Sequence, residues 1–435
     1  MKTKEKTRKI NVVSLGCSKN LVDSETLMAQ LEANDFQVVH DSIALSDIVI
    51  INTCGFITDA KQESVDTILE YVHAKEKGLI QELYVMGCLT QRYKEDLKEL
   101  IPGVDRYFGV DNLQAVIREI GGKYRTELIG ERSLATPNHY AYLKISEGCD
   151  RKCTFCAIPL IRGRHKSKTI SEVLKEAGYL AEKGVKEIIL IAQDLSYYGY
   201  DIYRKQQLPL LIDELSKIRG IEWIRLHYAY PAGFPGSVLN VMMENSKICK
   251  YLDIPIQHIN NRILSLMQRG HSKEETIRLL NKIRNEVPGI ALRTTLIVGF
   301  PGETREEFNE LVDFVKKFRF DRLGIFPYSA EEGTKAFKLP DNIPANVKTD
   351  RMEKLMCLQK DISLELNTAK IGKVFPAIID REESEFYIGR TESDSPEVDN
   401  EVLIRKQNHN LLSGEFYPVM VTKADYYDIF GEVVV

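Results

Sequence analysis

Three cysteines in one short loop restrict this chain more than any other feature. Cys149, Cys153 and Cys156 have the spacing C-x3-C-x2-C. This spacing is too tight to place the thiols on separate strands, and it suits a loop wrapped round one metal cluster. Thiolate sulfur is the soft donor that iron–sulfur chemistry selects. Three thiolates on a four-iron cluster leave one iron open to a small molecule, much as a catalytic zinc site keeps one position free.

Two simpler explanations of this loop are a disulfide with a spare thiol and a zinc knuckle that lacks its fourth ligand. No histidine or fourth cysteine lies at zinc-site spacing. The apolar segment from Ile10 to Cys17 is too short and too polar for a signal peptide, and no run of about 18 apolar residues follows. We therefore expect a cytoplasmic protein without a membrane segment, whose cysteines are metal ligands or buried thiols.

Residues 1–130 alternate between strand and helix patterns. The expected strands are Ile10 to Leu15, Asp47 to Asn52 and Leu83 to Met86, and the expected helices are Asp23 to Ala33, Thr58 to Lys77 and Gln91 to Leu100. Asp23 is the predicted N-cap of the first helix, and Gly78 closes the second. Continuous apolar strands are typical of parallel sheets covered on both faces. The pattern predicts an open, doubly wound α/β sheet.

Each of these three strands ends in a cysteine, namely Cys17, Cys54 and Cys88. The carboxyl ends of parallel strands meet at one edge of the sheet, so the three thiols can converge. Neighbouring glycines allow close backbone approach, and the helix N-termini that follow favour thiolate over thiol. One cysteine at a strand end is usually a small core residue. Three in the same topological position predict a second three-cysteine cluster.

A polar linker at 131–139 leads to a longer repeat over residues 140–345. Its expected strands are Ala141 to Ile145, Glu187 to Ala192, Trp223 to Tyr228, Leu252 to Pro255, Ala291 to Val298 and Arg322 to Tyr328. Its expected helices are Ser171 to Lys183, Pro209 to Ile218, Gly236 to Glu244, Lys273 to Glu286 and Arg305 to Lys317. This series predicts a partial (β/α)6 TIM-like barrel. The C-x3-C-x2-C loop follows its first strand, where the chemistry of such barrels belongs.

An amphipathic helix at 346–369 connects the barrel to residues 370–435, which predict a small antiparallel β-barrel. Its expected strands are Val374 to Ile379, Glu385 to Arg390, Glu401 to Ile404 and Tyr417 to Thr422. From residue 370 onward the chain has seven basic and thirteen acidic residues, with nine carboxylates between 380 and 401. Such a surface repels phosphates, so we expect no direct tRNA binding and an acidic docking face for a basic protein. An ordinary solvated face is the alternative.

The cysteine loop, with Phe155 before its third cysteine, resembles the signature of the radical S-adenosylmethionine (AdoMet) superfamily. The whole chain resembles the methylthiotransferases of that superfamily. The shared segments are 14–20, 52–55 and 86–88 around the first three cysteines, Pro255-Ile256-Gln257-His258, Gly299-Phe300-Pro301-Gly302-Glu303, and a TRAM-type barrel with Gly389-Arg390-Thr391 and Pro396-Glu397-Val398-Asp399. One branch of the family modifies an adenosine beside the tRNA anticodon. The other methylthiolates an aspartate β-carbon of small-subunit ribosomal protein S-twelve, and Cys17-Ser18-Lys19-Asn20, Asp23-Ser24-Glu25 and Arg162-Gly163-Arg164 look more like this second branch.

The resemblance implies two [4Fe–4S] clusters, AdoMet and a flavodoxin- or ferredoxin-like electron donor. One cluster, on Cys149, Cys153 and Cys156, would reduce AdoMet to a 5′-deoxyadenosyl radical, and the other, on Cys17, Cys54 and Cys88, would carry sulfur. The candidate AdoMet contacts are Phe155, Gln193, Asp194, Arg225, Gln257 and Gly299. We interpret His227 and His258 as packed residues.

Two other functions compete with modification of a ribosomal protein. The first is methylthiolation of tRNA isopentenyladenosine. The second is a non-catalytic iron–sulfur protein that senses redox state, although this hypothesis leaves the six-stranded barrel without a use.

Overall fold

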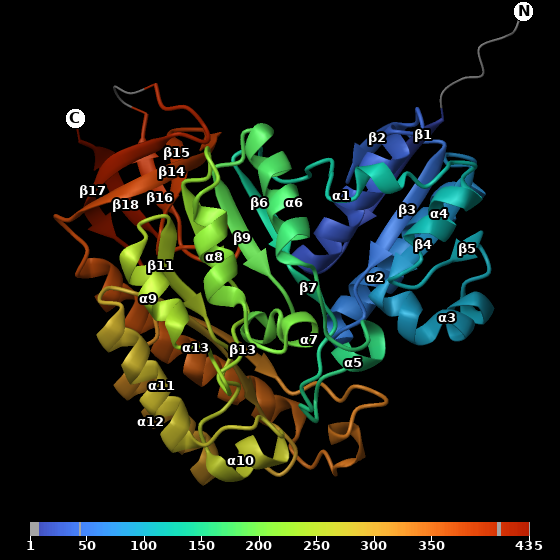
Figure 1. Ribbon diagram of the computed structural model, residues 1–435. Helices are drawn as coiled ribbons and strands as arrows, with labels where there is room; N and C mark the ends of the chain where they lie inside the picture. The colour runs from blue at the N-terminus through green and yellow to red at the C-terminus, as the bar shows by residue number, and fades with distance from the viewer. Residues whose placement is uncertain (1–7, 43–44, 407–409, 435) are drawn as a thin grey trace, which may run out of the picture.

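The structure is a computed structural model that describes residues 8–42, 45–406 and 410–434. An amino-terminal sheet, a central barrel and a small carboxyl-terminal barrel follow one another along the chain (Figure 1). The predicted fold class is confirmed. In the part of the chain described, no helix has the length and apolar character needed to cross a membrane.

The amino-terminal sheet has five parallel strands in the order β2-β1-β3-β4-β5. Its elements are β1 (Lys9–Ser14), α1 (Ser18–Glu32), β2 (Gln37–His40), β3 (Ile48–Thr53), α2 (Thr58–Glu76), β4 (Glu82–Gly87), α3 (Cys88–Leu100), β5 (Arg106–Tyr107) and α4 (Leu113–Glu119). One apolar cluster joins the sheet to α1 and α4, and another joins its opposite face to α2 and α3. The sheet is therefore doubly wound. The three cysteine-bearing strands, β1, β3 and β4, are neighbours.

The first helix begins earlier than predicted. Helix α1 starts at Ser18 with Cys17 as its N-cap residue, so the prediction that Asp23 caps it is wrong. The chain turns sharply at Gly16, where φ is +89°, and a Cβ there would lie 2.6 Å from the Cβ of Cys54. Only glycine fits this turn, which takes the chain directly from β1 into the helix.

The central barrel has six parallel strands, which pair in sequence order. The strands are β6 (Tyr140–Lys144), β9 (Glu187–Ile191), β10 (Trp223–Leu226), β11 (Ile248–Asp253), β12 (Ala291–Val298) and β13 (Arg322–Pro327), and the long helices between them are α6 (Ile170–Glu182), α8 (Leu208–Ser216), α9 (Ser237–Glu244), α11 (Lys273–Glu286) and α12 (Arg305–Phe318). Shorter elements decorate the strand ends: β7 (Ser146–Glu147), α5 (Ile158–Ile161), β8 (Lys166–Ser167), α7 (Tyr200–Tyr203) and α10 (Asn261–Leu266). Strands β7 and β8 pair across the base of the cysteine loop.

Helix α13 (Ala345–Thr368) leads into the closed carboxyl-terminal barrel, whose strand order is β14-β15-β16-β18-β17. These strands are β14 (Val374–Glu383), β15 (Phe386–Thr391), β16 (Val402–Arg405), β17 (Phe416–Ala424) and β18 (Ile429–Val433). The barrel is not fully antiparallel, because β18 pairs with β16 in parallel. The sequence analysis missed β18, which closes the barrel.

The small barrel closes the amino-terminal end of the central barrel, opposite α5, α7 and α10 (Figure 1). Glu187, the first residue of β9, pairs with Arg225 at 2.7 Å and with Arg390 of the small barrel at 2.8 Å. Arg293 likewise pairs with Asp399 at 2.6 Å. Four of these five side chains are almost fully buried and Arg293 is 19% exposed, so ion pairs occupy this end of the central barrel.

These contacts correct the prediction of an acidic docking face. Of the nine carboxylates between 380 and 401, only four belong to exposed residues, namely Glu382, Glu383, Glu385 and Glu397. The others face the central barrel or the small barrel itself. Asp394, for example, pairs with Arg322 of β13, and both are buried. Part of the acidic excess of the tail, including Asp394 and Asp399, therefore attaches the tail to basic residues of the central barrel.

Candidate functional site

The structure brings Cys17, Cys54 and Cys88, called here the sheet cysteines, to one edge of the amino-terminal sheet. Cys17 precedes α1, Cys54 follows β3, and Cys88 is the first residue of α3. Close backbone packing holds them there. A Cβ on Gly55 would lie 2.7 Å from the backbone nitrogen of Leu89. Gly16 and Gly55, which flank Cys17 and Cys54, therefore allow close contacts that a larger residue would prevent.

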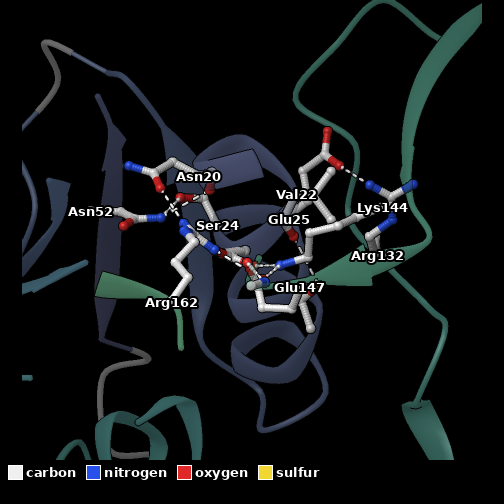
Figure 2. Close-up of polar contacts among 12 residues, drawn as sticks. Asn20, Val22, Ser24, Glu25, Asn52, Arg132, Lys144, Glu147 and Arg162 are labelled. Carbon is white, nitrogen blue, oxygen red and sulfur yellow. Dashed lines mark hydrogen bonds and ion pairs between the residues drawn. The ribbon is translucent and has the colours of Figure 1, made fainter. Parts of the chain in front are cut away.

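Asn20 of α1 fixes the strand ends that carry the sheet cysteines. Its side-chain amide donates to the carbonyls of Leu15 and Thr53, each at 3.0 Å. The side chain of Asn52 in turn donates to the Asn20 carbonyl at 2.9 Å (Figure 2). The Sγ of Cys88 lies 3.5 Å from the Asn20 Oδ1. One buried amide therefore ties β1, β3 and α3 together at the cysteine edge.

Burial is the largest influence on the pKa of two sheet cysteines, Cys54 and Cys88. It raises the pKa of the Cys54 thiol, and it raises the pKa of Cys88 to about 12 against the opposing charge of Arg162. The prediction that the following helices favour thiolate is therefore wrong for these two residues. Thiols of this kind lose their protons when a metal binds, so metal loading here releases protons.

Cys149, Cys153 and Cys156, called here the loop cysteines, receive hydrogen bonds from the surrounding barrel. The Arg151 backbone N–H donates to the Cys149 Sγ at 3.4 Å, and the Arg269 guanidinium donates to the Cys153 Sγ at 3.2 Å. Burial raises the pKa of Cys149 to about 11 and that of Cys156 to about 12, and the charges of the other loop cysteines act in the same direction. Donors of this type stabilise sulfur ligands of iron–sulfur clusters.

Both cysteine sets fit a cluster better than a single ion. Among the residues that the structure describes, no three cysteine, histidine, aspartate or glutamate side chains are arranged to hold one metal ion. A zinc site needs four ligands round one centre. A [4Fe–4S] cluster instead takes each thiolate on a different iron, so its ligands stand farther apart. The zinc-knuckle alternative therefore loses support.

The two cysteine sets lie close to each other across the domain boundary. Cys88 packs against Ala157 and Ile161, which directly follow the cysteine loop. Arg162, at the end of α5, reaches into the amino-terminal domain (Figure 2). Its guanidinium donates to the Asn20 Oδ1 at 2.5 Å and pairs with Asp23 at 3.0 Å.

Arg162 belongs to a balanced cluster of two cations and two carboxylates. It also pairs with Glu147 at 2.9 Å, and Lys144 of β6 pairs with Asp23 and Glu147. Arg132 of the linker forms a second ionic bridge between these domains, because it pairs with Glu25 of α1 at 2.7 Å and with Glu176 of α6 at 3.1 Å. The sequence analysis noted Arg162 only as part of a motif and gave no role to Asn20 or Lys144. Residues so distant in sequence show no local sign of pairing.

Four of the six predicted AdoMet contacts surround the mouth of the barrel. Phe155 packs in an apolar cluster with Phe300, beside Gly299. The Gly299 turn, with φ +69°, is held by the carboxylate of Glu303, which accepts from the Gly299 and Phe300 N–H groups. The side-chain oxygens of Gln193 and Gln257 are buried without a hydrogen-bond partner. Unpartnered buried acceptors of this kind fit a polar ligand.

The side chains of the other two predicted contacts, Arg225 and Asp194, are not available to bind AdoMet, because both are engaged by other residues. Arg225 is fully buried at the opposite end of the barrel, where it pairs with Glu187 and donates to the Glu392 carbonyl at 2.6 Å. Asp194 lies at the mouth, but its carboxylate accepts from Arg151 at 2.7 Å and so supports the cysteine loop.

Comparison with known families defines the class of this fold and site. Residues 143–315 match the model of the radical SAM superfamily, in which SAM is AdoMet. Residues 9–109 match the "Uncharacterized protein family UPF0004", and residues 371–434 match the TRAM domain. The protein is thus a radical SAM protein with a TRAM domain, and its class implies AdoMet and a [4Fe–4S] cluster.

Full-length relatives define the family more closely. The chain is 55% identical over 433 residues to "Ribosomal protein uS12 methylthiotransferase RimO" of Flavobacterium psychrophilum, covering 99% of this chain and 100% of the relative. It is 54% identical over 431 residues to the protein of the same name from Bacteroides fragilis, with the same coverage. The chain therefore belongs to the RimO family of radical SAM methylthiotransferases, and it is a transferase.

A solved structure supports the fold independently. The radical S-adenosylmethionine methyltransferase TsrM from Kitasatospora setae aligns with a TM-score of 0.56 at 15% identity, covering 88% of this chain and 81% of that one. At this identity the likeness concerns the fold alone.

Proposed function

We propose that this protein attaches a methylthio group to the β-carbon of an aspartate in ribosomal protein uS12. The observation that carries the proposal is the placement of two three-cysteine sets on facing edges of two domains, in a chain that matches RimO relatives along its whole length. Each set would hold one [4Fe–4S] cluster. The branch assignment rests on these relatives and not on the charge of the tail, part of which is paired with the central barrel.

The loop cysteines would hold the cluster that works with AdoMet. When bound, this pair of cofactors supplies the 5′-deoxyadenosyl radical that removes a hydrogen atom from an unactivated carbon. Phe155, Gln193, Gln257 and Gly299 would contact AdoMet, because they surround the barrel mouth and two of them present unpartnered acceptors. Asp194 would position the loop through Arg151.

The sheet cysteines would hold the cluster that carries sulfur. Asn20 sets the spacing of the strand ends, and Arg162 places a positive charge beside Cys88. Because Cys88 packs on the segment after the cysteine loop, the two clusters would face a common space at the domain boundary. A substrate carbon held there is within reach of both reactions.

The electron donor would be a flavodoxin- or ferredoxin-like protein that approaches the outer side of the cysteine loop. The segment 335–338 covers this side, with the Ala336 N–H donating to the Thr154 carbonyl at 2.8 Å. Lys152, Lys335 and Lys338 are exposed there, and none of them has a carboxylate within 4.0 Å in the described part of the chain. Exposed Phe337 lies among these residues. An acidic donor complements such a surface.

The proposal is tested with the reconstituted enzyme, AdoMet and a strong reductant. We expect 5′-deoxyadenosine, and a uS12 peptide that gains the mass of a methylthio group on aspartate. Mass spectrometry of uS12 and tRNA from cells that lack the gene supplies the in vivo comparison. Modification of tRNA isopentenyladenosine with uS12 ignored would establish the other branch. No 5′-deoxyadenosine from fully loaded protein would favour the non-catalytic sensor.

A further inference from the structure

Lys19 is a buried cation without a carboxylate partner. It is the second residue of α1 and is 9% exposed. In the part of the chain that the structure describes, no carboxylate lies within 4.0 Å of its ammonium group. Its contact is instead the ring of Tyr228, whose centroid is 3.2 Å from the Lys19 Nζ. Lysine is rarely buried in this way without a counter-ion.

The position of Lys19 links the two domains at the site. Its neighbours along the chain, Cys17 and Asn20, belong to the sheet-cysteine edge. Tyr228 follows strand β10 of the central barrel. The Lys19 side chain therefore crosses from the sulfur-carrying domain to the carboxyl end of the barrel, where Gln193 and Gln257 also have unpartnered acceptors.

The surrounding structure holds Lys19 without a direct ion pair among the described residues. Tyr228 has a φ of 63°, which is unusual for a residue other than glycine and is typical of strained functional positions. The Tyr228 N–H bonds to the buried carboxyl group of Asp253, and the Asp253 Oδ1 has no partner. Asp253 thus supports the backbone that carries the ring. The ring face holds the ammonium by a cation–π contact. Burial raises the pKa of the Asp253 carboxyl to about 6, and the positive charges of Arg293 and Lys19 oppose this shift, although no described carboxylate forms an ion pair with Lys19 within 4.0 Å.

We propose that the Lys19 ammonium binds the side-chain carboxylate of the substrate aspartate. The inference rests on the proposed function and adds a specificity residue to it. The reacting β-carbon is bonded directly to that carboxylate, so a fixed carboxylate fixes the carbon between the two cysteine sets. Charge-assisted hydrogen bonds of this kind are short and roughly twice as strong as neutral ones.

The test compares two uS12 peptides that differ only in aspartate or asparagine at the target position. Affinity is measured by fluorescence anisotropy with the reconstituted enzyme, and kcat/KM by mass spectrometry. The wild type should bind the aspartate peptide about tenfold or more tightly than the asparagine peptide. Lys19→Met keeps the stem on the Tyr228 ring and removes the charge. It should lower affinity for the aspartate peptide alone and bring the ratio close to one.

Three further variants control the interpretation. Lys19→Arg should keep the preference for aspartate, and Lys19→Gln, a second neutral variant, should lose it as Lys19→Met does. Lys61→Met removes another lysine at the domain boundary, one that pairs with Glu331 at 3.0 Å, and should leave the ratio unchanged.

The proposal is overturned if Lys19→Met retains the wild-type ratio. It is also overturned if both peptides weaken equally, which would make Lys19 a structural contact between the domains. AdoMet affinity is measured in parallel, and a loss there that matches the loss on the peptide would assign Lys19 to AdoMet. A wild-type enzyme that ignores both peptides and methylthiolates tRNA would overturn the proposed function itself.

Discussion

Replacing Arg162 by glutamine should loosen the contact between the amino-terminal sheet and the central barrel. The Arg162 side chain is 3% exposed and reaches Asn20, Asp23 and Glu147. With glutamine, these two carboxylates retain only Lys144 as a cation. The change therefore leaves one unbalanced negative charge beside the sheet cysteines.

The size of the effect follows from how far water reaches the carboxylates. Breaking a fully buried ion pair by removing one partner costs about 3–5 kcal/mol. The Asp23 and Glu147 side chains are 21% and 25% exposed, so water partly solvates the charge that is left. We therefore expect a cost at or just below the lower limit of that range, about 2–3 kcal/mol. Asp23→Asn combined with Arg162→Gln restores the charge balance and should cost less than the sum of the two single changes.

The assay is urea unfolding followed by native-state hydrogen exchange in α1, which reports opening of this boundary separately from global unfolding. Arg164→Gln is the matched control, because Arg164 is exposed, carries the same charge two residues later and has no ion pair among the described residues. That control should change stability by less than about 0.5 kcal/mol. If Arg162→Gln were no more destabilising than Arg164→Gln, the ionic cluster would have no structural importance.

Three further predictions address other parts of the chain. Replacing the three loop cysteines by alanine should abolish AdoMet cleavage and leave about four of about eight irons per chain; loss of all iron from a folded protein would contradict independent clusters. Burial raises the pKa of Glu303 to about 7, with Arg351 opposing. The pKa of Glu303 in the folded protein is therefore higher than its ordinary value of 4.5, and folding favours the neutral carboxyl group. The free energy of unfolding should fall as the pH rises from about 5 through 7, by up to about 3 kcal/mol. Glu303→Gln should flatten that pH profile in thermal unfolding, and an unchanged slope would refute the assignment. Asp399→Asn leaves Arg293 without its buried partner and should cost about 3 kcal/mol in urea unfolding, against little for exposed Glu385→Gln; equal effects would be contrary to the model of the interface.

The order and type of the main elements could be predicted because each depends on a local pattern. Continuous apolar runs marked β1, β3 and β4, and the strand–helix alternation after Pro137 marked the six barrel strands. Elements without such a signal were missed. Strand β5 has two residues, and β18 contains Gly431, whose added Cβ would lie 2.4 Å from Val419. Glycine there reflects close packing inside a closed barrel, which a single sequence does not reveal.

The cysteine sets could be predicted for a topological reason, and the polar contacts around them could not. Strand ends of a parallel sheet converge whatever lies between them in sequence. No comparable topological rule predicts which side chains pair with Arg162. Asp23 has the features of a helix N-cap in the sequence, yet its carboxylate pairs with Lys144 and Arg162 from the next domain. The prediction that Arg225 contacts AdoMet failed for a similar reason. Its position near the end of a strand does not show whether its side chain lies at the mouth of the barrel or at its closed end.

The carboxyl ends of the parallel strands in both domains indicate where the substrate approaches. Both cysteine sets lie at the carboxyl edges of parallel strands, and the packing of Cys88 on Ala157 turns these two edges toward each other. The opposite end of the central barrel is filled by contacts such as Glu187 with Arg390. The segment of uS12 that carries the aspartate therefore has to enter at the boundary between the two domains. The Arg162–Asp23 contact at that boundary has a partly exposed partner, whereas the Glu25–Arg132 and Glu331–Arg92 pairs are buried. Under the proposed function, Lys19 would meet the aspartate carboxylate at the partly exposed margin near Asp23.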